Sequence, residues 1–144
     1  MANPRLSGVT ASLTFALAVC ASTAWAQTPV ERDGHFNAEQ ASRGRLVYAE
    51  RCASCHGRAL NDGTAPPLAG EQFIRSWGRP GRTLDDLFYI TRTSMPQGEG
   101  GSLSDGQYLD VTAYLLERNG YAAGNQELTS DAAVLSAVTI RPGA

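Results

Sequence analysis

The chain has 144 residues, which is enough for one small domain but not comfortably for two. Its formal net charge is −2, and all 12 of its basic residues are arginine. This balance excludes the basic face that a nucleic-acid-binding protein would show, so we expect no nucleic-acid partner.

The start of the chain has the pattern of an export signal. Arg5 supplies a positive charge, residues 9–24 are small, mostly apolar and uncharged, and residues 24–26 read Ala-Trp-Ala, which fits the rule for signal cleavage. We expect a cut after Ala26, which removes one arginine and changes the net charge from −2 to −3. The apolar run is short for a membrane span. The sequence therefore predicts an exported, periplasmic protein.

Cys20 leaves a second possibility open for this leader. The stretch from Leu17 to Cys20 resembles a bacterial lipoprotein box, in which the cysteine becomes the lipidated first residue and tethers the protein to a membrane. Val19 stands where that box usually has glycine, alanine or serine. We therefore expect Cys20 to be discarded with the leader.

The first helical pattern follows a short arm. Residues 27–37 are polar and include proline and glycine, and helix-favouring alanine, arginine and glutamate then extend from Ala38 to Cys52. Gly44 lies inside this helix at a cost of about 1 kcal/mol relative to alanine. A glycine kept at such a position is typical of a close helix crossing. Residues 57–70 contain three glycines and two prolines, which predicts a loop.

Capping patterns predict two further helices. Thr83 with Asp86 three residues later has the pattern of a capping box, and an apolar face follows it. Pro96 lies in the loop that ends this helix. Ser104 with Gln107 forms a second capping box, and this last strong helix ends at Asn119-Gly120.

The remaining segments complete an all-α prediction. A short apolar turn is expected over 73–77, and a short helix after Ser130 precedes an extended end. No alternating pair of strands is visible, so we expect three principal helices joined by long loops. The predicted organisation is a signal peptide (1–26), an arm (27–37), a domain (38–120) and a C-terminal extension (121–144).

The run Arg51 to Gly57, "RCASCHG", carries the chemistry. Cys52 and Cys55 are three residues apart, so on a helical turn their thiols share a face, and His56 follows directly. A C-x-x-C-H run is the sequence sign of covalent haem c attachment. The two thiols add to the two vinyl groups of one porphyrin, and the imidazole binds the iron. We therefore predict one haem c with its iron.

Two other interpretations of the cysteines are weaker. A thioredoxin-like dithiol also uses C-x-x-C, but it requires a surrounding βαβ pattern that the sequence does not show. A structural zinc site needs four ligands. After cleavage the chain offers only Cys52, Cys55, His56 and the distant His35.

Met95 is the predicted second iron ligand. It is the one methionine besides Met1, and it lies beside Pro96 in a polar loop, which is a poor place for a core filler. Packing of Met95 remains the alternative. A bis-histidine iron with His35, or an open iron as in a peroxidase or gas sensor, is also possible.

Taken together, these motifs over residues 38–120 resemble the class I (mitochondrial-like) c-type cytochromes. The resemblance implies a cytochrome c-type fold, with three principal helices and long loops wrapped around one haem. It implies that Gly44 and Tyr48 of the first helix cross the last helix near Tyr114. The closing segment, residues 91–121, is similar to small periplasmic cytochromes associated with quinoprotein alcohol or sugar dehydrogenases.

The resemblance also assigns two more residues to the cofactor site. The backbone carbonyl of Pro66 would accept a hydrogen bond from the ring N–H of His56, which fixes the tautomer of the ligand. Trp77 would lie near a haem propionate or in the pocket wall, with plain core burial as the alternative.

The function expected from these features is periplasmic electron transfer. The protein would be a monomer that accepts electrons from a dehydrogenase, possibly a quinoprotein, and passes them to an oxidase or another cytochrome of a respiratory chain. No catalytic acid, base or nucleophile is implied, so we expect a protein that is not an enzyme. Two alternatives stay open: an electron-transfer subunit of a quinoprotein dehydrogenase, and a peroxidase-like haem enzyme.

Overall fold

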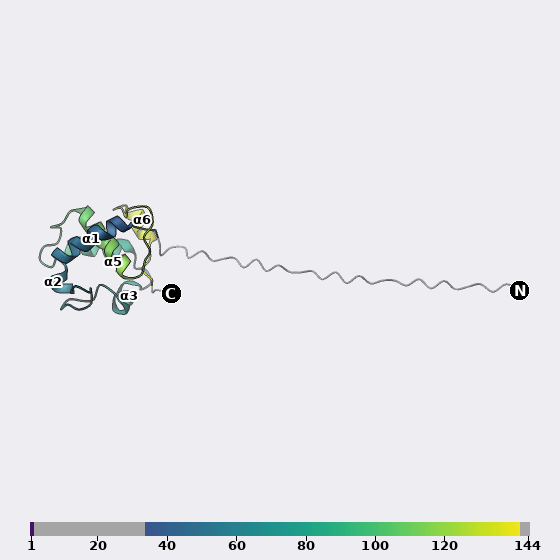
Figure 1. Ribbon diagram of the computed structural model, residues 1–144, viewed down its shortest axis with the longest axis horizontal. Helices are drawn as coiled ribbons and strands as arrows, with labels where there is room; N and C mark the ends of the chain where they lie inside the picture. Colours follow the sequence, from purple (N-terminus) through teal and green to yellow (C-terminus); the bar gives the residue numbers. More distant parts are fainter. Residues whose placement is uncertain (2–33, 142–144) are drawn as a thin grey trace.

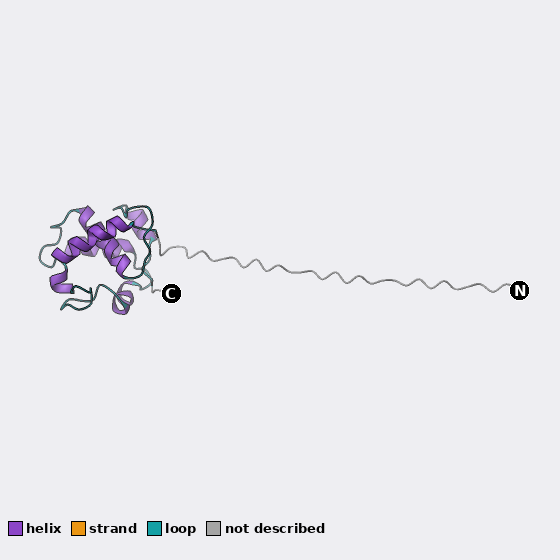
Figure 2. Ribbon diagram, viewed as in Figure 1, coloured by secondary structure: helices purple, strands orange, loops and turns teal. Residues whose placement is uncertain are grey.

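A computed structural model describes residue 1 and residues 34–141. Within these residues the protein consists of helices and loops, with one isolated bridge between Asn37 and Gly124. This confirms the all-α prediction, and Figure 2 shows the helices joined by long loops. The expected signal peptide beyond residue 1, with Cys20 and the cleavage site, and most of the expected arm lie outside the described residues.

The described part of the chain contains six helices, of which three are long. They are α1 (Ala38–Arg51), α2 (Ala53–His56), α3 (Glu71–Trp77), α4 (Leu84–Ser94), α5 (Asp105–Arg118) and α6 (Ala132–Ala137). Figure 1 shows α1 and α5 crossing at the centre, with α6 and α3 on opposite sides of them. None of the helices in residues 34–141 combines the length and the apolar character needed to cross a membrane.

A glycine makes the crossing of α1 and α5 possible. A side-chain carbon added to Gly44 would overlap the carbonyl oxygen of Asp110 and lie 3.0 Å from Cβ of Tyr114. One turn further along α1, the ring of Tyr48 packs on that of Tyr114 with centroids 5.4 Å apart. The predicted crossing near Tyr114 is therefore confirmed, and backbone contact explains why the helix retains a residue of low helix propensity.

The end of the first helix differs from the prediction. We expected one helix through Cys52, but α1 ends at Arg51, and Cys52 has φ −123° and ψ −35°. A separate four-residue turn, α2, follows and carries Cys55 and His56. The helix is thus broken at Cys52, so α1 alone does not present the whole C-x-x-C-H run.

The two predicted capping boxes are confirmed. The N–H of Thr83 donates to the carboxylate of Asp86 at 2.8 Å, at the start of α4. The N–H of Ser104 donates to the side-chain oxygen of Gln107 at 3.0 Å, at the start of α5. Residues 73–77, expected as a turn, belong to the seven-residue helix α3.

The C-terminal extension packs into the same core as the helices. Five of its apolar side chains are buried: Tyr121, Leu128, Leu135, Val138 and Ile140. Its helix α6, which starts after the cap Asp131, confirms the short helix expected after Ser130.

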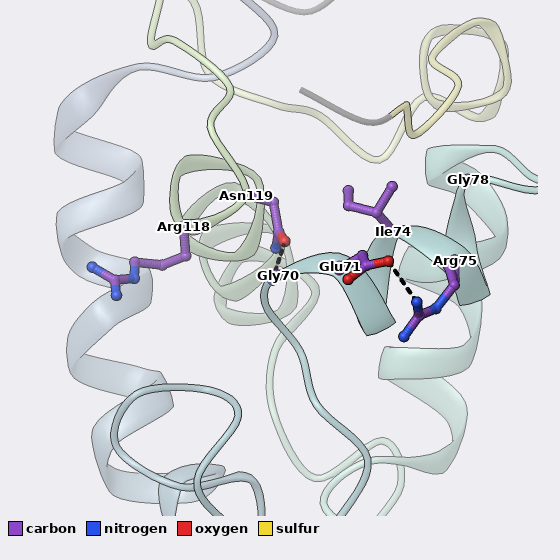
Figure 3. A pocket seen from close by; sticks show the side chains of 7 residues that line it. All are labelled: Gly70, Glu71, Ile74, Arg75, Gly78, Arg118 and Asn119. Atoms are coloured by element: carbon purple, nitrogen blue, oxygen red, sulfur yellow. Dashed lines mark hydrogen bonds and ion pairs between the residues drawn. The ribbon is translucent and has the colours of Figure 1, made fainter. Parts of the chain in front are cut away.

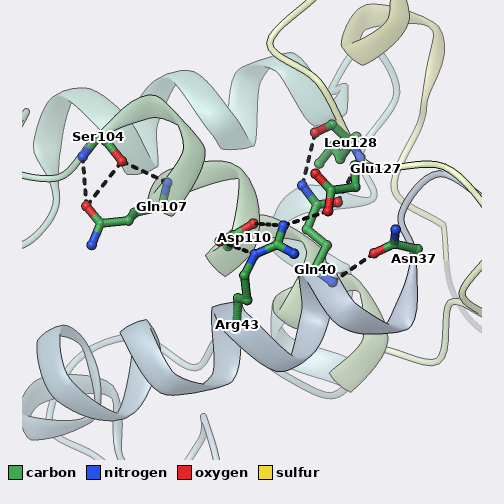
Figure 4. A network of polar contacts seen from close by, with 8 residues as sticks. All are labelled: Asn37, Gln40, Arg43, Ser104, Gln107, Asp110, Glu127 and Leu128. Carbon is green, nitrogen blue, oxygen red and sulfur yellow. Dashed lines mark hydrogen bonds and ion pairs between the residues drawn. The ribbon is translucent and has the colours of Figure 1, made fainter.

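Polar contacts join this extension to α1, as Figure 4 shows. The side chain of Gln40, which is 2% exposed, donates to the carbonyl of Leu128 at 3.0 Å and accepts from its N–H at 2.7 Å. Arg43 binds both carboxylate oxygens of Asp110, at 3.0 and 2.9 Å, and the carboxylate of Glu127 at 2.8 Å. These contacts make residues 121–141 part of the domain that holds the site.

Candidate haem site

His56 has one ring nitrogen bound and the other without a partner. Its Nδ1 lies 2.8 Å from the backbone oxygen of Pro66, and since a carbonyl can only accept, Nδ1 carries the proton. In a neutral imidazole Nε2 is then the basic nitrogen. The residue is 8% exposed, and no hydrogen-bond partner for Nε2 lies within residues 34–141. A buried acceptor left without a partner is costly, and a metal ion would satisfy it.

The loop after His56 places the Pro66 carbonyl. Gly57 has φ +82°, which only glycine adopts readily, and an added Cβ would overlap the side chain of Asp62. The hydroxyl of Tyr48 on α1 donates to the carbonyl of Gly57 at 2.7 Å. The N–H of Ala65 donates to the carbonyl of Cys55 at 2.9 Å. The loop is thus closed onto the turn that carries the thiols.

Asn119, at the end of α5, holds the far end of this loop. Its side-chain N–H groups donate to the carbonyl of Leu68 at 3.0 Å and to that of Leu115 at 2.8 Å. Its side-chain oxygen accepts from the N–H of Gly70 at 3.0 Å. One amide therefore joins the last turn of α5 to the segment that follows Pro66.

The two thiols near His56 are free and differ in exposure. Cys52 is half-buried and Cys55 is exposed. Burial raises the pKa of the Cys52 thiol to about 11, with the neighbouring Cys55 adding to the effect and Arg51 opposing it. Cys52 packs against the smaller core cluster, which contains Tyr48 and Leu60 among others. The protein presents one apolar-packed thiol and one exposed thiol on adjacent turns.

Met95 ends α4, and its backbone is held at both polar groups. Its N–H donates to the carbonyl of Thr91 at 3.1 Å, and its carbonyl accepts from the hydroxyl of Tyr108 at 2.7 Å. The side chain is half-buried, and it is not among the residues of 34–141 that form or pack against the two core clusters. This placement gives no support to the alternative of Met95 as a core filler.

Trp77 lies at the end of α3 and packs against the larger core cluster. Its ring centroid is 6.4 Å from that of Phe73, and the guanidinium of Arg82 lies 4.9 Å above its ring. Within the described residues, no hydrogen bond, ion pair or ring contact joins Trp77 or Met95 to His56. The contacts of Trp77 match core burial, and its place beside the cofactor stays a prediction.

A structural zinc site and a thioredoxin-like dithiol have little support in the described residues. Within residues 34–141 no group of three or more His, Cys, Asp or Glu side chains is arranged to hold a metal ion. The described chain also lacks the βαβ unit expected around a dithiol. His35, the alternative second ligand, is half-buried in the segment before α1.

A hollow of about 660 Å³ lies beside α3. Figure 3 shows Arg118 pointing away from Ile74, while Arg75 is occupied by an ion pair with Glu71 at 2.6 Å. The hollow is lined by Gly70, Glu71, Ile74, Arg75, Gly78, Arg118 and Asn119. None of these provides a thiol, imidazole or thioether.

Residues 39–115 match the family model described as "Cytochrome C oxidase, cbb3-type, subunit III". The chain belongs to this cytochrome c family. Membership confirms the resemblance to c-type cytochromes and implies a haem c with its iron and electron transfer through it. The free thiols and the unpartnered ring nitrogen of His56 fit such a group.

The chain is similar to two curated proteins named thiosulfate dehydrogenase. It is 36% identical over 80 residues to a thiosulfate dehydrogenase of Stutzerimonas stutzeri, covering 51% of the chain and 26% of that protein. It is 35% identical over 78 residues to a thiosulfate dehydrogenase of Psychrobacter arcticus, covering 49% and 24%. The chain thus spans about a quarter of the length of these curated relatives.

A solved structure is similar to a larger part of the chain. The cytochrome superimposes on the sulfane dehydrogenase SoxCD from Paracoccus pantotrophus with a TM-score of 0.52 and 28% identity, covering 69% of this chain and 52% of that one. The expectation that the protein is not an enzyme is therefore wrong as it stood, because the similar proteins are named dehydrogenases, although the similarity covers only their cytochrome part. The expectation considered only the side chains of one domain, whereas the names belong to whole proteins.

Two residues of the site region were not assigned a role from the sequence. Asn119 was recognised only as the end of a helix, and no contact with the Met95 loop was expected of Tyr108. The Asn-Gly pair indicated a helix end, but nothing in the sequence pattern shows that this amide reaches Leu68 and Gly70. The contacts of Tyr108 with the Met95 loop likewise depend on tertiary packing.

Proposed function

We propose that this cytochrome carries one haem c, joined by thioethers to Cys52 and Cys55, with His56 and Met95 as its axial ligands. We further propose that it is the electron-transfer component of a periplasmic dehydrogenase that oxidises a sulfur compound. The observation that carries the first proposal is the buried imidazole of His56, fixed through Nδ1 by Pro66 and left with a basic Nε2. The second proposal is supported by the names of the similar proteins.

When bound, the haem supplies a centre that accepts and releases one electron at a time. The residues of the chain would set the equilibrium between the ferric and the ferrous state, and thus the reduction potential. The carbonyl of Pro66 accepts a hydrogen bond from Nδ1–H of His56, which orients the ring and fixes the tautomer that leaves Nε2 for the iron. A thioether opposite the imidazole favours the ferrous state. An apolar surrounding acts in the same direction, because the ferric state carries one more positive charge.

Export agrees with this role. The predicted leader over residues 1–26 would deliver the chain to the compartment where c-type haem is attached. Contact with the donor would be brief and would use a small surface patch. The donor would be the catalytic part of a dehydrogenase, and the acceptor an oxidase or another cytochrome.

Haem staining on a denaturing gel tests attachment. We expect the protein made in cells that mature c-type cytochromes to keep its haem under denaturing conditions. The double variant Cys52→Ala/Cys55→Ala should lose the stain. Absence of stain in the unaltered protein would reject a covalent haem.

A redox titration with visible spectra tests the ligands. We expect the ferric protein to show a methionine–iron absorption band, and Met95→Ala to lose this band, lower the reduction potential and bind cyanide at once. His35→Ala is the control and should leave all three properties unchanged. An unchanged spectrum and potential in Met95→Ala would reject Met95 as ligand, and a changed spectrum in His35→Ala would favour the bis-histidine centre.

The dehydrogenase role is tested in cells that lack this chain. We expect thiosulfate-dependent oxygen uptake to fall, to recover with the unaltered protein, and to stay low with His56→Ala. If thiosulfate-dependent uptake were normal while alcohol- or sugar-dependent uptake fell, the quinoprotein alternative would replace the sulfur proposal.

A further inference from the structure

The hydroxyl of Tyr108 lies at the centre of the loop that carries Met95. It donates to the carbonyl of Met95 at 2.7 Å and accepts from the N–H of Gly101 at 3.0 Å. A longer contact of 3.4 Å joins it to the N–H of Leu103. A phenol can donate one hydrogen bond and accept two, so these three contacts use its full capacity. One oxygen atom thus connects the start of the loop with its end.

Tyr108 is itself firmly placed. Its side chain is 1% exposed and belongs to the larger core cluster. It lies in the first turns of α5, directly after the capping box of Ser104 and Gln107. A buried aromatic ring on a capped helix has few alternative positions, so its hydroxyl is a fixed point for the loop.

We propose that Tyr108 is the positioning residue of Met95: its hydroxyl keeps the loop of residues 95–103 closed, so that the thioether stays on the iron. This inference depends on the proposed ligation by His56 and Met95. Tyr108 would not touch the iron and would act only through the Met95 backbone.

Other contacts hold the loop but do not replace this one. The N–H of Gly101 is shared with the carbonyl of Arg92 at 2.8 Å, and Glu99 is paired with Arg51 at 2.8 Å. Both lie several residues beyond the methionine. Within residues 34–141, the hydroxyl of Tyr108 is the one hydrogen-bond donor to the carbonyl of Met95.

Tyr108→Phe in the haem-loaded protein tests the proposal, because it removes the hydroxyl and keeps the ring. The carbonyl of Met95 then loses its donor, which favours opening of the loop. We expect a weaker methionine–iron band in the ferric protein and cyanide association faster by roughly tenfold, which corresponds to the loss of one such hydrogen bond.

Tyr121→Phe is the matched control. In the unaltered protein, the hydroxyl of Tyr121 accepts a hydrogen bond from the N–H of Arg141 at 2.8 Å, in the C-terminal extension. It should lower the melting temperature to a similar extent while leaving the methionine–iron band and the cyanide rate unchanged. Equal effects of the two variants on the cyanide rate would show that Tyr108 acts only on global stability, and would overturn the proposal.

Amide hydrogen exchange in the unaltered protein gives a second test that needs no variant. If the loop must open before the thioether leaves the iron, the amide of Gly101, which Tyr108 and Arg92 share, should be protected in the closed loop. The opening rate measured at this amide should be at least as high as the limiting rate of cyanide association at high cyanide. Unprotected exchange at Gly101 while the methionine–iron band persists would overturn the inference, as would a cyanide rate unaltered in Tyr108→Phe. Absence of that band in the unaltered protein would instead reject the ligation on which the inference depends.

Discussion

Arg51 and Glu99 form an ion pair at 2.8 Å that joins the end of α1 to the loop after Met95. The same guanidinium donates to the hydroxyl of Ser102 at 3.2 Å. Arg51 directly precedes Cys52, so the pair connects the segment that carries the thiols with the segment that carries the thioether. Both side chains are partly exposed, which limits the energy of the pair.

Reversing one charge of this pair should be mildly destabilising. We expect Arg51→Glu to lower the free energy of unfolding by about 0.5–1 kcal/mol in low salt, because it places two carboxylates together. The double variant Arg51→Glu/Glu99→Arg should recover most of the loss. Urea unfolding at low and high salt measures both, and a loss that is independent of salt and not recovered would contradict an electrostatic role.

Gly44→Ala should be strongly destabilising. The added carbon would overlap the backbone of Asp110, so α1 and α5 would have to separate along the crossing that contains Tyr48 and Tyr114. We expect a loss of about 2–4 kcal/mol, in the range of overpacked core substitutions that force backbone movement.

Gly106→Ala is the matched control for that substitution. Gly106 lies in α5 with only the side-chain oxygen of Ser104 within 4 Å of the added carbon, at 3.9 Å. Alanine should here stabilise the helix by up to about 1 kcal/mol. Thermal unfolding of both variants measures the difference, and a similar effect at the two glycines would show that helix propensity, not helix contact, decides the outcome at Gly44.

Asn119→Asp should loosen the loop that carries Pro66. An aspartate at 119 can still accept from the N–H of Gly70, but it cannot donate to the carbonyls of Leu68 and Leu115. We expect a loss of about 1–3 kcal/mol, since two partly buried carbonyls lose their donors. Hydrogen exchange at Leu68, whose N–H donates to Leu60 at 2.6 Å, should become faster.

The exchange measurement also separates a local from a global effect. Protection in α4, which Asn119 does not contact, should fall only as far as global stability falls. If Leu68 exchanged no faster than these amides, the amide of Asn119 would have no particular role in holding the loop.

The features that the sequence predicted depend on short spacings. Thr83 with Asp86 and Ser104 with Gln107 form their capping boxes within one helical turn, so three residues of sequence contain the whole interaction. The C-x-x-C-H run is equally local. A close helix crossing could be predicted at Gly44 because glycine is unfavourable inside a helix unless another backbone approaches it. The resemblance to c-type cytochromes then identified the helix that contains Tyr114 as the one that crosses there.

The features that escaped prediction depend on contacts between distant residues. Gln40 and Leu128 are 88 residues apart, and neither has a pattern that indicates a buried amide. The break at Cys52 was hidden because no glycine or proline, the residues that most disfavour a helix, stands between Gly44 and Gly57. A dehydrogenase partner was expected from the resemblance, but the thiosulfate and sulfane dehydrogenase names were not, because no side chain of a cytochrome domain reveals the reaction of the protein with which it works.

Gln40→Leu should be the most informative substitution in the extension. Leucine has a similar volume but leaves the N–H and the carbonyl of Leu128 without partners in a buried position. We expect a loss of about 2–4 kcal/mol, because each buried backbone group left unpaired costs about 1–3 kcal/mol. Gln40→Glu, the matched variant, keeps the acceptor for the Leu128 N–H but cannot donate to its carbonyl.

Proteolysis tests whether this contact holds the extension of residues 121–141 on the fold. If it does, both Gln40 variants should raise the rate at which a protease cleaves the extension. Glu127→Gln weakens only the exposed pair with Arg43, so it should leave the cleavage rate nearly unchanged. A stable Gln40→Leu protein with an uncleaved extension would show that apolar packing of Leu128 and its neighbours is sufficient.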